Sequence, residues 1–97
     1  MARIEDIQQR WREHEALPFP RGMRGKMLGG VDLTLLQSNF ARFVMTAIEL
    51  NAPLGARSRG MLDDQRKILE SILPQLEGEA RIYFERLRGL AKDVSTL

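Results

Sequence analysis

The chain has 97 residues, of which 43% are hydrophobic and 29% charged, and its formal net charge is +2. This length predicts one domain spanning residues 1–97, and the composition is that of a globular protein rather than a disordered one. The absence of cysteine excludes disulfides, thiolate catalysis and zinc-finger sites, and a single histidine excludes a multi-histidine metal centre within one chain.

Residues 3–16 are predicted to form an amphipathic helix. Ile4, Ile7 and Trp11 fall at i, i+3 and i+7 and therefore share one face of that helix. Pro18 and Pro20 follow closely, so the helix must end near residue 17.

Residues 17–30 contain two prolines and four glycines, which excludes a regular helix. Five apolar residues in this stretch predict that it packs against the rest of the protein instead of forming a free linker. The pair Gly29-Gly30, flanked by apolar residues, is typical of a two-residue hairpin turn and suggests a short β-hairpin at 26–33.

Residues 34–51 are predicted to form a second helix, because apolar residues recur from Leu33 to Leu50 at alternating spacings of three and four. Its start is open among three candidate capping residues, Asp32, Thr34 and Ser38. Pro53 ends the helix, and residues 52–60 are expected to be a connector.

The strongest pattern in the chain is a heptad stripe in its last third. One set of residues recurs every seven positions: Leu62, Leu69, Leu76, Tyr83, Leu90 and Leu97. A second set with the same spacing interleaves with it: Leu73, Ala80, Leu87 and Val94. Such a stripe is typical of the core face of a helical bundle or of a seam between subunits.

Pro74 and Gly78 interrupt this stripe, which leaves two interpretations. A single helix could run from about 61 to 95 with a kink at Pro74, or two helices, 61–73 and 77–95, could fold back on each other. We favour the single helix, because the heptad phase persists across the proline and a turn has no need to preserve it.

The predicted fold is therefore mainly α: a small helical bundle with a long, Pro-kinked C-terminal helix and a short hairpin. Five heptads present more apolar stripe than two shorter helices can cover, which predicts an isologous homodimer formed through the long helix. The expected interface residues are Leu62, Leu69, Leu73, Leu76, Ala80, Tyr83, Leu87 and Leu90.

The sequence offers few groups for catalysis. His14 lies between Glu13 and Glu15, but neighbours on a helix point about 100° apart, so we interpret it as a boundary histidine at a helix end. No serine has a GxSxG context, and no Glu-x-x-His pair suggests a di-metal bundle. We predict no enzymatic activity, no cofactor and no metal.

A basic loop is the alternative lead. Arg21, Arg24 and Lys26 alternate with glycines in PRGMRGK, where side chains and open backbone N–H groups could hold an anion. The stretch has neither Walker-loop nor dinucleotide-fingerprint spacing. Even with Arg57 and Arg59, the charges are few, which makes nucleic acid an improbable partner.

The sequence predicts a broad class of function but no specific partner or process. We expect a non-enzymatic protein–protein interaction or scaffold module that self-associates, with anion or nucleic-acid binding as the alternative. The chain has no apolar run near the ~20 residues of a membrane-spanning helix, and its first residues lack a secretory signal. We therefore expect no membrane partner and a cytoplasmic location.

Overall fold

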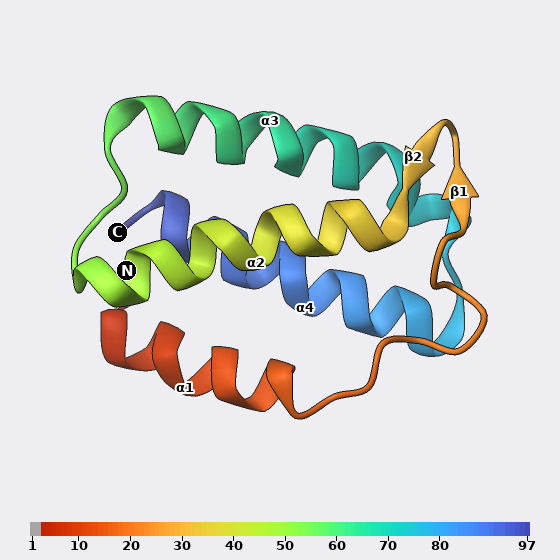
Figure 1. The fold of residues 1–97 in the computed structure, drawn as a ribbon, viewed down its shortest axis with the longest axis horizontal. Helices are drawn as coiled ribbons and strands as arrows, with labels where there is room; N and C mark the ends of the chain where they lie inside the picture. The colour runs from red at the N-terminus through yellow and green to blue at the C-terminus, as the bar shows by residue number, and fades with distance from the viewer. Residues whose placement is uncertain (1–2) are drawn as a thin grey trace.

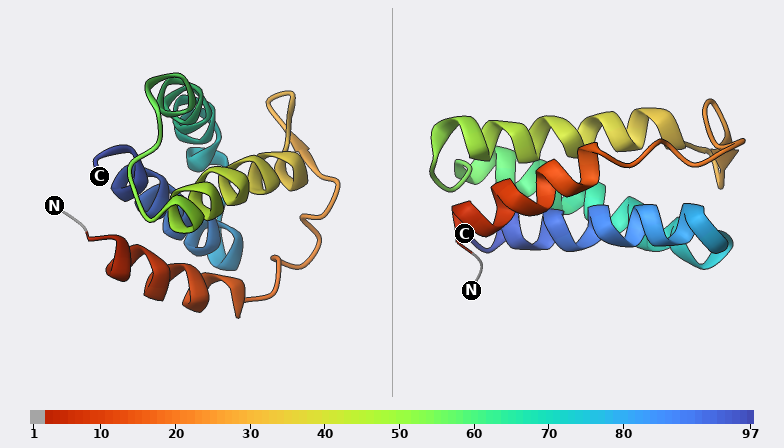
Figure 2. Two further views of the ribbon diagram at one scale, coloured as in Figure 1. Left: turned by 60° about the vertical axis from the view of Figure 1, so that its left-hand side comes forward. Right: turned by 90° about the horizontal axis from the view of Figure 1, so that it is seen from below.

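Four helices dominate residues 3–97, the part of the chain that the computed structural model describes. They are α1 (Ile4–Glu15), α2 (Leu33–Leu50), α3 (Ala56–Ile72) and α4 (Gly78–Ser95). A short 3-10 turn, η1 (Leu73–Gln75), and two antiparallel strands, β1 (Met27–Leu28) and β2 (Val31–Asp32), complete the elements. The helices pack side by side around a shared core, as Figures 1 and 2 show, so the prediction of a mainly α small bundle is confirmed.

The hairpin predicted at 26–33 is present. Leu28 pairs with Val31, and the two glycines between them have positive φ angles, 54° at Gly29 and 78° at Gly30. Two consecutive residues with positive φ are what a tight hairpin turn requires, and glycine adopts this conformation without steric cost. The hairpin leads directly into α2.

Asp32 caps α2. Its carboxylate accepts hydrogen bonds from the backbone N–H groups of Thr34 at 2.9 Å and Leu35 at 3.1 Å. These bonds satisfy donors that have no partner within the helix, and they select Asp32 from the three candidates. The helix ends at Asn51, in the left-handed region at φ 51°, two residues before Pro53.

The last third of the chain folds as two helices, so the prediction of one kinked helix over 61–95 is wrong. α3 ends at Ile72, and η1 contains Pro74. The backbone is extended at Leu76 and Glu77 and reverses through Gly78, whose φ is +57°. α4 then returns beside α3 (Figure 1). The protein extends only 34 Å along its longest axis, whereas an unbroken helix over 61–95 would need about 50 Å.

Heptad phase failed to distinguish the two interpretations for a physical reason. When a turn preserves the seven-residue spacing, the apolar stripes of the two helices face the same core. The heptad pattern is therefore as compatible with two packed helices as with one long helix. Leu73 and Leu76 lie within the turn itself and are buried there. Proline has no backbone N–H to donate. It is tolerated at position 74 because the short 3-10 turn does not need a hydrogen bond from that nitrogen.

Polar contacts hold α4 against its neighbours. The Ser95 hydroxyl donates to the Asp63 carboxylate at 2.8 Å, and Arg88 pairs with Glu70 at 3.4 Å. The first contact joins the last residue of α4 to an early residue of α3, as antiparallel packing requires. On the opposite side of α4, Arg10 and Asp93 form an ion pair between α1 and α4.

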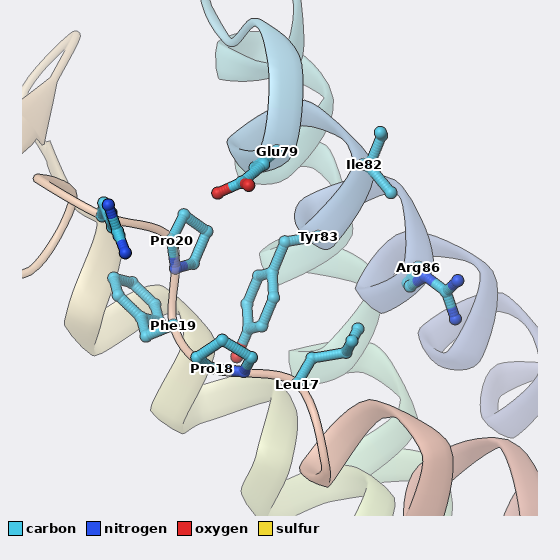
Figure 3. A pocket seen from close by; sticks show the side chains of 9 residues that line it. Leu17, Pro18, Phe19, Pro20, Glu79, Ile82, Tyr83 and Arg86 are labelled. Atoms are coloured by element: carbon cyan, nitrogen blue, oxygen red, sulfur yellow. The ribbon is translucent and has the colours of Figure 1, made fainter.

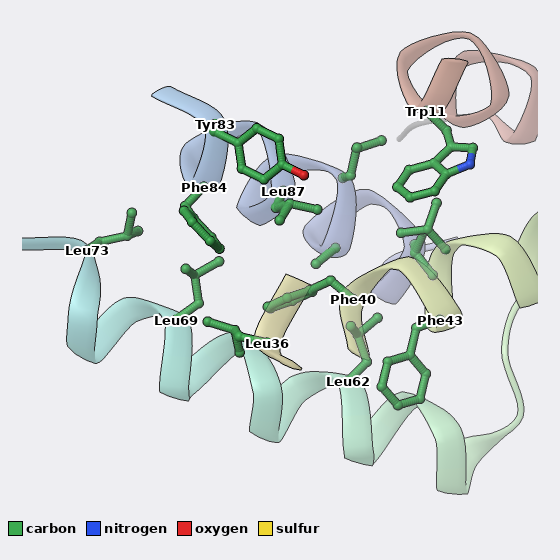
Figure 4. Close-up of a cluster of buried hydrophobic side chains, with 14 of the residues drawn as sticks. Trp11, Leu36, Phe40, Phe43, Leu62, Leu69, Leu73, Tyr83, Phe84 and Leu87 are labelled. Carbon is green, nitrogen blue, oxygen red and sulfur yellow. The ribbon is translucent and has the colours of Figure 1, made fainter. Parts of the chain in front are cut away.

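The residues expected at a subunit interface lie in the core of the single chain. All eight are at most 7% exposed: Leu62, Leu69, Leu73, Leu76, Ala80, Tyr83, Leu87 and Leu90. Figure 4 shows several of them converging on α2 residues such as Phe40 and Leu36. The break at residues 73–77 turns the apolar stripes of α3 and α4 towards the same core.

The connector predicted at 52–60 is also shorter than expected. α3 begins at Ala56, with Gly55 as its N-cap, so Arg57, Arg59 and Gly60 are helical. This first turn carries no large apolar residue before the stripe begins, which is why periodicity placed the start of the helix too late.

Candidate functional site

The proline segment, Leu17–Pro20, is the irregular stretch that crosses one side of the bundle after α1. Its prolines prevent helix continuation, and Phe19 turns inward onto α4. The Phe19 ring lies edge-on to Tyr83 at 5.4 Å between centroids and to Phe84 at 6.1 Å. Edge-to-face pairs at these distances are favourable, so Phe19 fixes the segment against the helix.

An open groove lies between the proline segment and α4. Its volume is about 660 Å³, and Figure 3 shows side chains of both elements around it. The lining residues are Leu17, Pro18, Phe19, Pro20, Arg21, Glu79, Ile82, Tyr83 and Arg86. We call this feature the α4 groove; most of its wall is apolar.

Exposed apolar and basic side chains meet in the α4 groove. Ile82 is 57% exposed and Leu17 38% exposed, although both are large and apolar. Arg21 and Arg86 also line the groove, against one carboxylate, that of Glu79. The four ion pairs formed within residues 3–97 use other arginines, namely Arg10, Arg66, Arg81 and Arg88. Two guanidinium groups are therefore free for an external acid.

A second cavity of about 370 Å³ lies on the other side of the proline segment, against α1 and α2. We call it the His14 pocket. Its lining residues are Trp11, His14, Glu15, Leu17, Phe19, Arg24, Thr34, Gln37, Ser38, Ala41, Met45 and Tyr83. Leu17, Phe19 and Tyr83 line both cavities, so the two cavities share these three side chains.

His14 is a buried residue rather than a boundary one. It is 3% exposed, and neither ring nitrogen has a hydrogen-bond partner among residues 3–97. Its ring lies 5.8 Å from that of Trp11 and 4.4 Å from that of Tyr83. Burial, reinforced by the positive charge of Arg86, lowers the pKa of His14 to about 4. The imidazole is therefore neutral at physiological pH.

Tyr83 lines both cavities, and its hydroxyl is available for hydrogen bonding. Burial raises the pKa of its phenol above the ordinary value, while Gln37 and the charge of Arg24 oppose that rise. The hydroxyl therefore stays protonated and able to donate a hydrogen bond. The sequence predicted that Tyr83 lies in an apolar seam, whereas in the structure its side chain lines both cavities.

The basic loop is divided between the two cavities. Arg21 lines the α4 groove and Arg24 lines the His14 pocket, with its guanidinium 5.3 Å from the centroid of the Phe19 ring. Lys26 lines neither. Arg57 and Arg59 lie at the start of α3, at the opposite end of the bundle from the loop (Figure 1). The five basic residues therefore do not form one surface.

Three groove residues carried no sequence signal. Phe19 lies in an irregular stretch, and Ile82 lies outside the two heptad sets. Arg86 is an ordinary charge on an amphipathic helix. Their shared role depends on where the proline segment crosses α4, which periodicity cannot specify.

Within residues 3–97, no group of three or more His, Cys, Asp or Glu side chains is arranged to hold a metal ion. Over the same range, no helix combines the length and hydropathy needed to cross a membrane. His14 also has no carboxylate at hydrogen-bond distance among these residues. A histidine general base oriented by an acid is therefore not assembled in this part of the chain.

Comparison with protein-family models, curated proteins and solved structures finds no match. A function for this chain must be argued from its own side chains.

Proposed function

We propose that this chain is a non-enzymatic protein–protein interaction module whose α4 groove holds a short acidic and apolar segment of a partner protein. One observation carries the proposal: exposed Ile82 and Leu17 share a groove with two arginines that are unpaired within residues 3–97. Exposed apolar side chains beside free guanidinium groups are typical of a surface that a partner covers.

The charge of the groove selects the kind of partner. Arg21 and Arg86 face one acid, Glu79, so the lining carries a net charge of +1. Guanidinium groups bind carboxylates through paired, charge-assisted hydrogen bonds. A partner segment with acidic residues beside apolar ones complements both features, whereas a basic segment would meet repulsion.

The apolar walls favour a peptide over nucleic acid. Nucleic-acid affinity grows with the number of phosphates neutralised, and the groove offers two basic groups for that purpose. The proline segment and Ile82 instead provide space for apolar side chains. The homodimer and the cytoplasmic location expected from the sequence stay predictions.

The test uses three labelled hexapeptides in a fluorescence-anisotropy titration of the full chain. One is acidic and apolar (EDLFEL), one is basic and apolar (KKLFKL), and one is acidic without apolar residues (EDSGES). We expect saturable binding of the first peptide alone. A 16-base-pair DNA duplex is the fourth probe, and binding of DNA in preference to EDLFEL would contradict the proposal.

Two variants with matched controls locate the binding surface. Arg86→Gln should weaken EDLFEL binding at least about tenfold, the loss expected for one charge-assisted hydrogen bond. Arg88→Gln changes the same charge on another face of α4 and should change affinity less than twofold. Ile82→Asp should abolish binding, whereas Leu35→Asp, at an equally exposed position on α2, should preserve it. Equal losses in variant and control would reject the groove as the binding site.

A further inference from the structure

The His14 pocket has the composition of a small-ligand site rather than of a packing defect. Three aromatic residues besides His14 line it, and polar side chains from α2 complete the wall: Trp11, Phe19 and Tyr83, with Thr34, Gln37 and Ser38. Its volume of about 370 Å³ lies within the range typical of small-molecule pockets, roughly 300–1,000 Å³. Polar atoms make up more of its exposed wall than apolar atoms, which suits a ligand that carries polar groups on an aromatic ring.

His14 supplies the most specific feature. Buried polar groups in folded proteins nearly always have a hydrogen-bond partner, and a buried group without one destabilises the fold. Both ring nitrogens of His14 lack a partner among residues 3–97. Because the ring is neutral, one nitrogen donates and the other accepts a hydrogen bond. Both nitrogens are covered in this structure, so a bound molecule with a polar ring atom would satisfy this need once the side chains that cover the ring move aside.

Arg24 supplies the charge. Its guanidinium lies over the Phe19 ring and makes no ion pair within residues 3–97. The loop that carries it is held to α2, since the backbone N–H of Gly25 donates to the Thr34 hydroxyl at 2.8 Å. This contact holds the backbone next to Arg24 against the pocket wall. Glu15 is the one acid in the lining and is exposed to solvent, which weakens its repulsion of an anion.

We propose that the His14 pocket binds a small planar heteroaromatic carboxylate. The ring would pack among the aromatic side chains, the carboxylate would pair with Arg24, and a ring heteroatom would exchange a hydrogen bond with His14. The proposal rests on a different cavity from the α4 groove and does not depend on peptide binding there.

The test is isothermal titration calorimetry of the full chain with quinoline-2-carboxylate at neutral pH. Three related compounds each lack one feature: naphthalene-2-carboxylate lacks the ring nitrogen, quinoline lacks the charge, and cyclohexanecarboxylate lacks the planar ring. We expect saturable binding of quinoline-2-carboxylate and at least tenfold weaker binding of each related compound. Equal affinity for cyclohexanecarboxylate, or no saturable binding of quinoline-2-carboxylate, would overturn the proposal.

Variants identify the pocket independently of the compounds. Arg24→Gln should weaken binding about tenfold or more, as expected for loss of a charge-assisted contact. Lys26→Gln removes the same charge from the same loop but lines neither cavity, so it should change affinity less than twofold. His14→Phe keeps an aromatic ring in place, removes both nitrogens, and should also weaken binding.

Trp11 gives a direct readout of location. It is the only tryptophan in the chain, so its indole N–H gives a single NMR cross-peak. That peak should shift on addition of quinoline-2-carboxylate in the wild type. Because Arg24 is exposed, its variant should fold even if His14→Phe does not, and unchanged affinity in Arg24→Gln would reject the assignment on its own.

Discussion

Truncation of Leu87 tests whether this residue lies in the core of one chain or in an interface between two subunits. Leu87 is 0% exposed in the single chain, on the face of α4 that points into the bundle. Leu87→Ala removes three methylene-sized groups, which at about 0.8 kcal/mol each gives a transfer loss of about 2.4 kcal/mol. The cavity left behind raises the expected loss in the free energy of unfolding to about 3–4 kcal/mol.

Urea denaturation followed by circular dichroism measures this loss. With an m value of about 1.5 kcal/mol/M, the urea midpoint should fall by about 2 M. Leu35→Ala is the matched control, because Leu35 is 58% exposed on α2 and the chemical change is the same. Its effect should stay within about 0.5 kcal/mol, as is usual for surface substitutions.

Protein concentration distinguishes the two origins of any loss. If Leu87 belongs to the core of one chain, the change in midpoint should be the same at low and high protein concentration. At a seam between subunits, the midpoint would rise with concentration and light scattering would show a lower mass for the variant. A Leu87→Ala protein with wild-type stability and a halved mass would refute the buried assignment.

Four other substitutions test separate parts of the structure. Gly60→Ala, inside α3 with open space around it, should stabilise the protein by about 0.5–1 kcal/mol, whereas Gly78→Ala, at φ +57°, should destabilise it by about 1–2 kcal/mol in the same urea assay. One continuous helix over 61–95 would instead make Gly78→Ala stabilising. Asp32→Ala should cost about 1 kcal/mol through loss of the α2 cap, measured by thermal unfolding. Folding lowers the pKa of His14 from 6.5 to about 4. Its contribution to the free energy of unfolding is therefore fully present above pH 6.5 and is lost as the pH falls towards 4. That loss is up to about 3 kcal/mol, and comparison with His14→Phe from pH 7 to 4 isolates it from the carboxylates; parallel curves would contradict the neutral buried state.

Local signals in the sequence predicted the elements they control directly. The apolar spacing of α1 and α2 identified both helices, and Gly29-Gly30 identified the hairpin. Asp32 was among the predicted caps, and Pro53 marked the end of α2. Each of these features is decided by a few neighbouring residues, so a short stretch of sequence is enough to specify it.

Features that depend on tertiary contacts were not predictable in the same way. The heptad stripe is satisfied by one long helix or by an antiparallel pair, and only packing against α2 selects the pair. His14 continues the apolar face of α1 one step past Trp11, which places it at the edge of that face. It is buried because the proline segment and Tyr83 cover it, and no local sequence pattern predicts these tertiary contacts.

The proline segment is what turns an ordinary helical bundle into one with two lined cavities. Leu17, Phe19 and Tyr83 belong to the walls of both, so a molecule bound on one side contacts side chains that shape the other. Rotation of Phe19 towards the α4 groove would enlarge the His14 pocket at the expense of the groove. Because coupling between two sites is reciprocal, a ligand in the pocket that displaces Phe19 must weaken peptide binding by the same factor by which the peptide weakens the ligand. The two proposed activities are therefore expected to compete through the side chains that both cavities share.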